Sequence, residues 1–385
     1  MLKSLTDTFD RFVRSEQSSS LLLIFCTVLA LVLTNSGLGS TYLSFWASQV
    51  AGLSLKHWVN DALMAVFFLL IGLEIERELY VGELSEPKKA LLPMVAAIGG
   101  MLAPALIHYG FNAGTATENG FGIPTATDIA FALGALALLG SRVPAALKVF
   151  VVAFAVMDDL GAIVIIAVFY TAKISLLNLL GALAVWLVLV AMNRFFGVLR
   201  LAPYLLGGAV MWFLMLKSGV HATISGVMLA FAIPFSSAKG GVSPSHRLEH
   251  ALHRPVGFFV LPIFALANAG ISFGSDWLQS LASANSAGIA TGLILGKPLG
   301  VILLCWVATV LRICRLPPEL NWIHVLGAGA LGGIGFTMSI FITDLAFGAD
   351  DQLVNASKLA ILLASIAAGA LGFVCLRFGV RSTQK

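Results

Sequence analysis

Residues 151–168 read VVAFAVMDDLGAIVIIAV, with two adjacent carboxylates, Asp158 and Asp159, midway along an otherwise apolar stretch. An ionised carboxylate costs roughly 2.5 to 3.5 kcal/mol at the centre of a membrane helix, so acids at such positions mostly face a cavity and serve ion or proton movement. A purely structural interpretation has to explain two costly residues at once. The stretch therefore predicts a membrane helix that carries an ion or proton site.

The composition of the chain indicates a polytopic membrane protein. Of its 385 residues, 59% are hydrophobic and only 11% are charged, against about 25% charged residues in soluble domains. A helix needs about 20 apolar residues to cross about 30 Å of hydrocarbon. Twelve tracts approach this length, near residues 20–33, 58–79, 91–107, 120–139, 145–170, 174–192, 201–216, 220–235, 256–271, 287–311, 323–342 and 353–373. The sequence thus predicts an all-α membrane protein of twelve transmembrane helices, with residues 1–385 forming a single transporter domain.

The basic residues predict how the chain is oriented in the membrane. An even number of spans puts both termini on one side. With twelve spans, eighteen of the 23 Lys and Arg residues fall on the side that holds the termini, four fall on the other side, and Lys297 lies inside a span. By the positive-inside rule both termini are cytoplasmic. The net charge of +4 therefore reports membrane orientation rather than nucleic-acid binding.

The fourth and eleventh predicted spans carry helix breakers. They read GFGIPTATD over residues 120–128 and GAGALGGIGFTMS over residues 327–339. Non-helical backbone at membrane depth is tolerated only where protein or a water-filled cavity satisfies its polar groups. Because the eleventh span comes seven after the fourth, the two run in opposite directions, and spans 3–5 and 10–12 become inverted three-helix repeats. Paired interruptions of this kind indicate the binding site of a secondary transporter. Glycines also allow helices to pack closely, and for the eleventh span close packing is an equally good interpretation.

The few charged residues within the spans predict the chemistry of the site. Half-helix ends that meet carry opposed partial charges of about half an elementary charge, and Asp128 and Lys297 are the acid and base available to balance them. Neighbours on a helix point about 100° apart, so one of Asp158 and Asp159 faces the cavity while the other finds a partner. Lys297 is the least costly partner. Carboxylate and hydroxyl oxygens suit hard cations such as Na⁺ or Li⁺; the hydroxyl of Thr127 either joins them or bonds its own helix.

A carboxylate that binds either a proton or a metal cation, but not both, is the minimal element of an exchanger. Two alternatives compete with this interpretation. The first is a sodium-coupled solute symporter, which could share the fold. A solute site should show aromatic or amide side chains around the helix breaks. A base paired to the acid, as Lys297 would be, instead suits proton exchange. An intramembrane aspartyl protease should resemble a Tyr-Asp plus Gly-x-Gly-Asp pattern, which is absent around Asp128, Asp158 and Asp159. We therefore expect a transporter, neither an enzyme nor dependent on a cofactor.

A second group of charges lies near the predicted cytoplasmic side. It comprises GLEIEREL at residues 72–79 and SHRLEHALHR at residues 245–254. Their default interpretation is a solvated interface with pairs three and four residues apart. The sharper hypothesis is a pH sensor, because His246, His250 and His253 would change charge near neutrality. Considered on their own, these residues favour the solvated interface.

Together these stretches resemble the NhaA-type sodium/proton antiporters of bacterial inner membranes. The resemblance is carried by GLEIEREL at 72–79, ATDIAFAL at 126–133, MDDLGA at 157–162, LEHALH at 248–253, GKPLG at 296–300 and GIGFTMS at 333–339. They follow the family's order across most of the chain. The resemblance implies an electrogenic, pH-regulated antiporter that exports Na⁺ or Li⁺ in exchange for protons by alternating access. It also implies a homodimer in the lipid bilayer of the cell inner membrane.

The resemblance assigns roles to individual residues of the spans. It implies that Asp159 is the main cation- and proton-binding carboxylate and that Asp158 pairs with Lys297. Asp128 and Thr127 would lie where the two broken helices cross. The bound ion would be the transported Na⁺ or Li⁺, held chiefly by Asp159 and Asp158, and not a resident metal.

The resemblance also changes the interpretation of the second charged group. It implies that Glu74, Arg77, Glu78 and Glu249 belong to a pH-response region, which favours the pH-sensor hypothesis for His246, His250 and His253. In one departure from the family pattern, His246 stands where a lysine is usual. In another, Glu76 adds an acid beside Glu74. We expect these departures to shift the pH at which transport begins.

Overall fold

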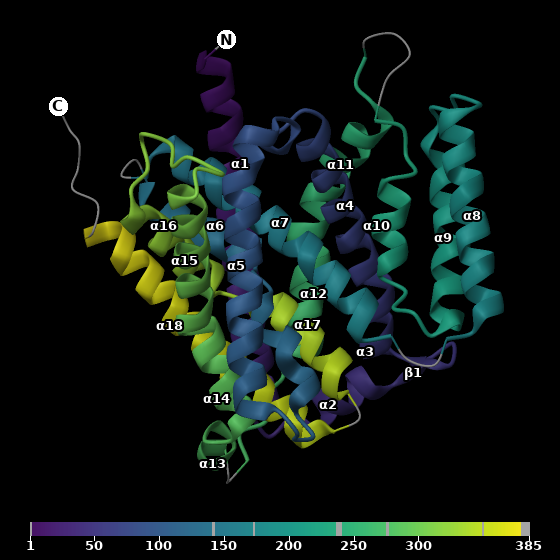
Figure 1. The fold of residues 1–385 in the computed structure, drawn as a ribbon. Helices are drawn as coiled ribbons and strands as arrows, with labels where there is room; N and C mark the ends of the chain where they lie inside the picture. The colour runs from purple at the N-terminus through teal and green to yellow at the C-terminus, as the bar shows by residue number, and fades with distance from the viewer. Residues whose placement is uncertain are drawn as a thin grey trace. The chain divides into compact units, whose positions relative to one another are not determined.

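The structure, a computed structural model, describes residues 2–140, 143–171, 174–235, 241–274, 277–348 and 350–378, with side chains from Ser18 onward. Within these ranges the fold is helical apart from one hairpin, β1 (Gln49–Val50) paired with β2 (Leu53–Ser54) (Figure 1). The predicted all-α class is confirmed. Five basic residues used to predict the orientation lie outside the described residues: Arg142, Lys173, Lys239, Arg381 and Lys385.

Nine helical segments of the described chain are long and apolar enough to cross a membrane, and counting each of two bent pairs as one span gives up to eleven. The nine are Leu55–Tyr80, Pro87–Asn112, Glu118–Leu138, Ala145–Phe169, Leu176–Arg194, Leu201–Ser218, Pro244–Asn268, Ala284–Val310 and Asp351–Phe378. The bent pairs are Ser18–Thr34 with α2 (Gly39–Ala47), at 114°, and α16 (Trp322–Gly332) with α17 (Phe336–Phe347), at 47°. The eighth predicted span contains only α10 (Ile224–Ala230), whose seven residues are too few to cross about 30 Å.

The chain forms two compact units, each assembled from separate segments. Unit 1 comprises Met1–Phe25, Glu83–Ala162 and Ile271–Lys385, and unit 2 comprises Cys26–Gly82 and Ile163–Gly270. The segments of the two units alternate along the sequence, so that α1 (Leu2–Thr34) and α7 (Ala145–Phe169) each contribute to both. A single domain over residues 1–385 stays a prediction.

Unit 1 holds both interrupted spans. Besides parts of α1 and α7 it contains α5 (Pro87–Asn112), α6 (Ile129–Leu138), α13 (Trp277–Leu281), α14 (Ala284–Thr291), α15 (Lys297–Val310), α16, α17 and α18 (Asp351–Phe378), with 3₁₀ helices η2 (Glu83–Ser85) and η3 (Glu118–Thr125) and a π-helical turn, η6 (Gly292–Gly296). α5 and α15 pack closely because Gly99 faces Gly300, and a Cβ at either position would collide with the backbone oxygen of the other. This contact holds the helix that begins at Lys297 against α5.

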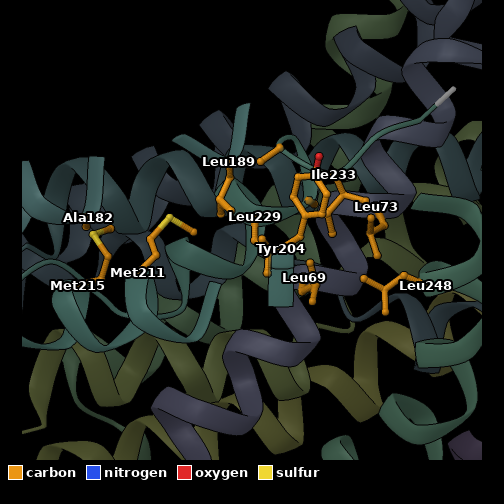
Figure 2. Close-up of a cluster of buried hydrophobic side chains, with 12 residues drawn as sticks. Leu69, Leu73, Ala182, Leu189, Tyr204, Met211, Met215, Leu229, Ile233 and Leu248 are labelled. Atoms are coloured by element: carbon orange, nitrogen blue, oxygen red, sulfur yellow. The ribbon is translucent and has the colours of Figure 1, made fainter. Parts of the chain in front are cut away.

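Unit 2 is stabilised by a buried apolar cluster. Its elements are α2, β1, β2, α3 (Leu55–Trp58), α4 (Met64–Tyr80), α8 (Leu176–Arg194), α9 (Leu201–Ser218), α10, α11 (Pro244–Pro255) and α12 (Leu261–Asn268), with π-helical turns η1 (Val59–Leu63) and η5 (Val256–Val260). Figure 2 shows Met211 and Met215 at one end of the cluster and Leu73 and Leu248 at the other. Within it, the Tyr204 hydroxyl donates to the carbonyl oxygen of Val198 at 3.0 Å. Within a membrane such a cluster is stabilised by the close packing of its side chains, because lipid tails are as apolar as the cluster itself.

Candidate functional site

The two interruptions expected from the sequence are present as non-helical backbone, and they touch. Residues 126–128 separate η3 from α6, and residues 333–335 separate α16 from α17. The N–H of Asp128 donates to the carbonyl oxygen of Ile334 at 2.6 Å. Each break therefore satisfies a backbone group of the other, as buried irregular backbone requires.

Asp128 ties the starts of two half-helices together. Its Oδ1 accepts a hydrogen bond from the N–H of Phe131 at 3.2 Å, in α6. Its Oδ2 accepts from both the N–H (3.0 Å) and the hydroxyl (2.5 Å) of Thr337, in α17. A buried carboxylate at two helix N-termini is stabilised by the partial positive charge of both. The nearby Thr127 hydroxyl donates to the carbonyl oxygen of Gly332 at 2.8 Å, so it bonds the facing segment and not its own helix.

A fully buried ion pair lies beside this crossing. Lys297 Nζ is 2.7 Å from Asp158 Oδ2, and both side chains are 0% exposed. The same ammonium group donates to the carbonyl oxygen of Thr125, the last residue of η3. Asp159, also buried, acts electrostatically on Lys297, and Thr127 lies near Asp158. Four predicted site residues therefore gather around the end of η3.

Asp128 and Lys297 have different hydrogen-bond partners. The bonds of Asp128 go to helix starts, whereas Lys297 bonds Asp158 and the η3 carbonyl. Asp158 Oδ1 is buried without a hydrogen-bond partner. Among the residues that the structure describes, no three His, Cys, Asp or Glu side chains form a metal-binding group. A hard cation held by Asp158 and Asp159 would therefore complete its oxygen shell with hydroxyl, backbone carbonyl or water oxygens.

The second charged group forms one network in unit 2, joining α4 to α11. Arg77 lies 2.5 Å from Glu249 and 2.9 Å from Glu78. His246 Nδ1 is 3.2 Å from the other Glu249 oxygen. Glu74 adds its field to that of the other acids around Arg77. The arginine and Glu249 thus form the centre of the network.

The remaining histidines and Glu76 lie around this centre. His253 is half-buried and lies in the field of Arg77 and of His250, which is exposed. Glu76 is buried and accepts a hydrogen bond from the Ser245 hydroxyl at 2.6 Å. A surface cavity of about 420 Å³ opens here, lined by Arg77, Val81, Phe235, Gly241, Val242, Ser243 and His246. The group predicted as a pH-response region is therefore a network with one water-accessible side.

Comparison with known proteins identifies the family. The family model described as Na⁺/H⁺ antiporter 1 matches residues 10–376. The chain belongs to this family. It is 64% identical over 375 residues to the Na(+)/H(+) antiporter NhaA of Dechloromonas aromatica, covering 97% of this chain and 96% of the relative. The Na(+)/H(+) antiporter NhaA 1 of Flavobacterium johnsoniae is 55% identical over 381 residues, or 99% of each chain. The Na(+)/H(+) antiporter NhaA of Vibrio campbellii is 48% identical over 378 residues, which cover 98% of this chain and 96% of the relative.

Membership of the Na⁺/H⁺ antiporter 1 family confirms the predicted resemblance and places the chain among transporters, not enzymes. With its many apolar helices, the chain is a multi-pass bacterial membrane protein. Ions are the transported substrates of this family, and the family uses no cofactor. The relatives' names give no support to the solute symporter or to the protease.

Two features of this family member were missed by sequence analysis. Thr337 was not singled out as the partner of Asp128, although a hydroxyl one residue into a new helix after a glycine-rich break is a usable signal. Lys358 was assigned to a loop end, but it is buried in α18 and lies 3.0 Å from Asp344 of α17. Lys297 is therefore not alone as a basic residue within the spans. A pair fourteen residues apart in sequence, on two helices, leaves no periodic signal.

Proposed function

We propose that this chain exports Na⁺ or Li⁺ in exchange for protons. The observation that carries the proposal is the buried Asp158–Lys297 ion pair, with Asp159 beside it, where two interrupted helices touch. Intramembrane carboxylates are costly unless they serve transport. The relatives that match nearly the whole chain are named Na(+)/H(+) antiporters.

In the proposed mechanism, Asp159 is the carboxylate at which a cation and protons compete. Asp158, paired with Lys297, holds the helix break and supplies a second oxygen to the cation. Facing the cytoplasm, the ionised site binds Na⁺; facing outward, it takes up protons and releases Na⁺; it then returns protonated. If more protons enter than Na⁺ ions leave, the membrane potential supplies roughly 2.3 kcal/mol per 100 mV for each net charge that moves inward. Asp128 and Thr127 keep the two breaks together during this alternation.

The finer architecture belongs to the same proposal. We infer twelve spans, counting α10 with its flanking turns as the eighth, and two inverted repeats. The first repeat would be α5, η3 with α6, and α7; the second would be α14 with α15, α16 with α17, and α18. The paired interruptions support this arrangement. By the positive-inside rule both termini are cytoplasmic in the inner membrane, and the functional form is a homodimer.

We further propose that the Arg77–Glu249 network regulates transport by pH. Its charged side chains are Glu74, Arg77, Glu78, His246, Glu249, His250 and His253. Three of them are histidines, which change charge near neutrality, and the network has a water-accessible side. Protonation can therefore reach it from the solvent and alter how α4 and α11 are joined.

The test is Na⁺- or Li⁺-induced dissipation of a preformed pH gradient in proteoliposomes, scanned from about pH 6 to 9, which includes the upper part of the range over which histidines change charge. The parent protein should respond to both cations in a pH-dependent manner. Asp159→Asn should be folded and inactive, whereas Asp351→Asn, which removes an exposed carboxylate at the start of α18, should behave like the parent. Cation-dependent proton movement retained in folded Asp159→Asn would overturn the assignment.

A further inference from the structure

A buried polar chain in unit 1 takes no part in the ion pair described above. His108 of α5, Asn285 of α14 and Ser357 of α18 are all at most 2% exposed. His108 Nε2 is 3.1 Å from Asn285 Oδ1, and Asn285 Nδ2 donates to Ser357 Oγ at 2.8 Å. Ser357 in turn donates to the carbonyl oxygen of Leu353 at 2.8 Å. Three helices are thus joined by a continuous series of hydrogen bonds.

The donors and acceptors in these hydrogen bonds determine which ring nitrogen of His108 carries a proton. Because Ser357 uses its proton on Leu353, it accepts from Asn285, and Asn285 Oδ1 then faces His108. Nε2 of His108 must therefore carry a proton and donate it. The other ring nitrogen, Nδ1, is buried without a hydrogen-bond partner. A second proton there would have no acceptor, so the ring acts as a neutral donor.

A neighbouring residue of α5, Asn112, helps His108 to hold the start of η3 in place. Asn112, one turn after His108, donates to the carbonyl oxygens of His108 (2.9 Å) and Ala284 (3.2 Å). Its Oδ1 accepts from the hydroxyl of Thr117, the residue before η3, at 2.6 Å. Gly120 of η3 packs against the His108 ring so closely that an added Cβ would lie 2.9 Å from the ring atom Cε1. The position of η3 is therefore set by α5 and α14 at its first turn.

The helix that carries Ser357 also contacts the second interrupted span. Lys358 follows Ser357 on α18 and pairs with Asp344 of α17 at 3.0 Å. Ser339 of α17 donates to the carbonyl oxygen of Ile123 in η3 at 2.7 Å. The start of η3 is thus held by α5 and α14, α17 is held near its end by α18, and the two half-helices are joined to each other.

The opposite ends of η3 and α17 form the site. η3 ends at Thr125, whose carbonyl oxygen accepts from Lys297, and α17 begins beside Thr337, which holds Asp128. A shift of η3 along its axis would move the Thr125 carbonyl away from Lys297 and change how that ammonium shares its charge with Asp158. A displacement of the first turn of η3 would therefore also displace its last residue, Thr125, at the ion site.

We propose that His108 and Asn285 are positioning residues for cation exchange: they hold η3 at the register in which Thr125 and Lys297 meet. The inference rests on the proposed function for its transport readout. A misplaced η3 weakens cation binding more than it slows turnover, so the apparent KM for Na⁺ should change while the maximal rate is largely kept. A structural role without this coupling would lower stability and leave KM unchanged.

The variants that test this are His108→Leu, Asn285→Ala and His108→Gln. Leucine leaves the Asn285 oxygen without its donor, and the loss of one buried hydrogen bond corresponds to an increase in KM of about three- to tenfold. Glutamine places an amide N–H near the position of Nε2 and cannot be protonated, so it should restore a KM close to that of the parent. Because both single variants break the same bond, the double variant His108→Leu/Asn285→Ala should show much less than the product of the two single increases.

The matched control is Tyr204→Phe, which removes one buried hydrogen bond in unit 2. It should leave the KM for Na⁺ unchanged. A parent-like KM in folded His108→Leu, a glutamine variant as impaired as the leucine variant, or the same increase in Tyr204→Phe would each overturn the proposal.

A second readout does not depend on transport. Hydrogen exchange of the backbone amides of residues 118–123 and 125 should be faster in His108→Leu than in the parent and normal in His108→Gln. Unchanged exchange in the leucine variant would refute the positioning of η3. An inactive parent with faster exchange in the leucine variant would refute the proposed function alone and leave the positioning of η3 supported.

Discussion

The Lys297–Asp158 ion pair of unit 1 and the Arg77–Glu249 ion pair of unit 2 have similar lengths and opposite surroundings. Lys297 and Asp158 are both 0% exposed, whereas Arg77 is 32% and Glu249 7% exposed. In a buried pair each charge depends on the other, because neither can turn to water. In a partly exposed pair water replaces a lost partner, and the net contribution is small. The first pair is therefore expected to be a fixed part of the site, and the second a contact that can separate at a small cost.

The largest difference between the two pairs is expected in stability. Lys297→Ala leaves Asp158 buried without its partner, which costs about 3 to 5 kcal/mol. The apparent melting temperature in detergent should fall sharply, and the pH profile of exchange should change. A variant with the melting temperature and the pH profile of the parent would show that the pair does not hold the site.

A double variant sharpens this prediction. Lys297→Met with Asp158→Asn removes both charges of the pair, so neither partner is left buried without the other. The double variant should recover much of the melting temperature lost in Lys297→Ala, without recovering exchange. No recovery would mean that packing around the lysine stem, and not charge compensation, dominates its contribution.

The hydroxyl that holds Asp128 provides a comparison within a single helix. Thr337→Val removes a hydrogen bond to a buried carboxylate, worth about 1.5 to 3 kcal/mol. Thr343→Val is the control, because that equally buried hydroxyl donates to the carbonyl oxygen of Ser339 in its own helix, a bond that adds little to helix stability. Thermal unfolding of both variants should give the larger loss for Thr337→Val, and equal losses would contradict the assigned role of Asp128.

A smaller stability effect is expected in unit 2. Arg77→Gln breaks the contacts with Glu249 and Glu78 together, yet the partly exposed pair should contribute about 1 kcal/mol or less. The pH dependence of Na⁺-driven proton flux should shift while the maximal rate remains. If the profile is unchanged and the melting temperature falls as far as in Lys297→Ala, the two pairs do not differ as proposed.

The smallest effect is expected at His246. Its contact with Glu249 is an ion pair only while the imidazole is protonated, and glutamine cannot carry that charge. If the protonated pair restrains transport, His246→Gln should begin exchange at a pH lower by a fraction of a unit, as measured from the flux profile. A shift toward higher pH would reverse the inferred sign.

Much of the ion site was predictable because its residues are chemically conspicuous where they stand. Asp128, Asp158, Asp159 and Lys297 are charges inside apolar runs, and Pro124 marks a break. Their rarity in such runs makes them informative.

The contacts between distant helices were not predictable in the same way. The bonds from Thr337 to Asp128 and from His108 to Asn285 join residues 209 and 177 positions apart, and neither helical periodicity nor hydropathy specifies which side chains meet. The eighth predicted span differs from a continuous helix for another reason. The apolar run at residues 220–235 was long enough, but it contains turns on both sides of α10, and hydropathy does not distinguish apolar helix from apolar turn.

The central claim is that Na⁺ and protons compete for the carboxylates beside Lys297. The most direct measurement is calorimetry of Na⁺ binding to the purified protein in two buffers of different ionisation enthalpy. The account predicts that the heat differs between the buffers, because bound Na⁺ displaces protons, and that Asp159→Asn shows no binding heat. Na⁺ binding with the same heat in both buffers would mean that no proton leaves, and would contradict exchange at this site.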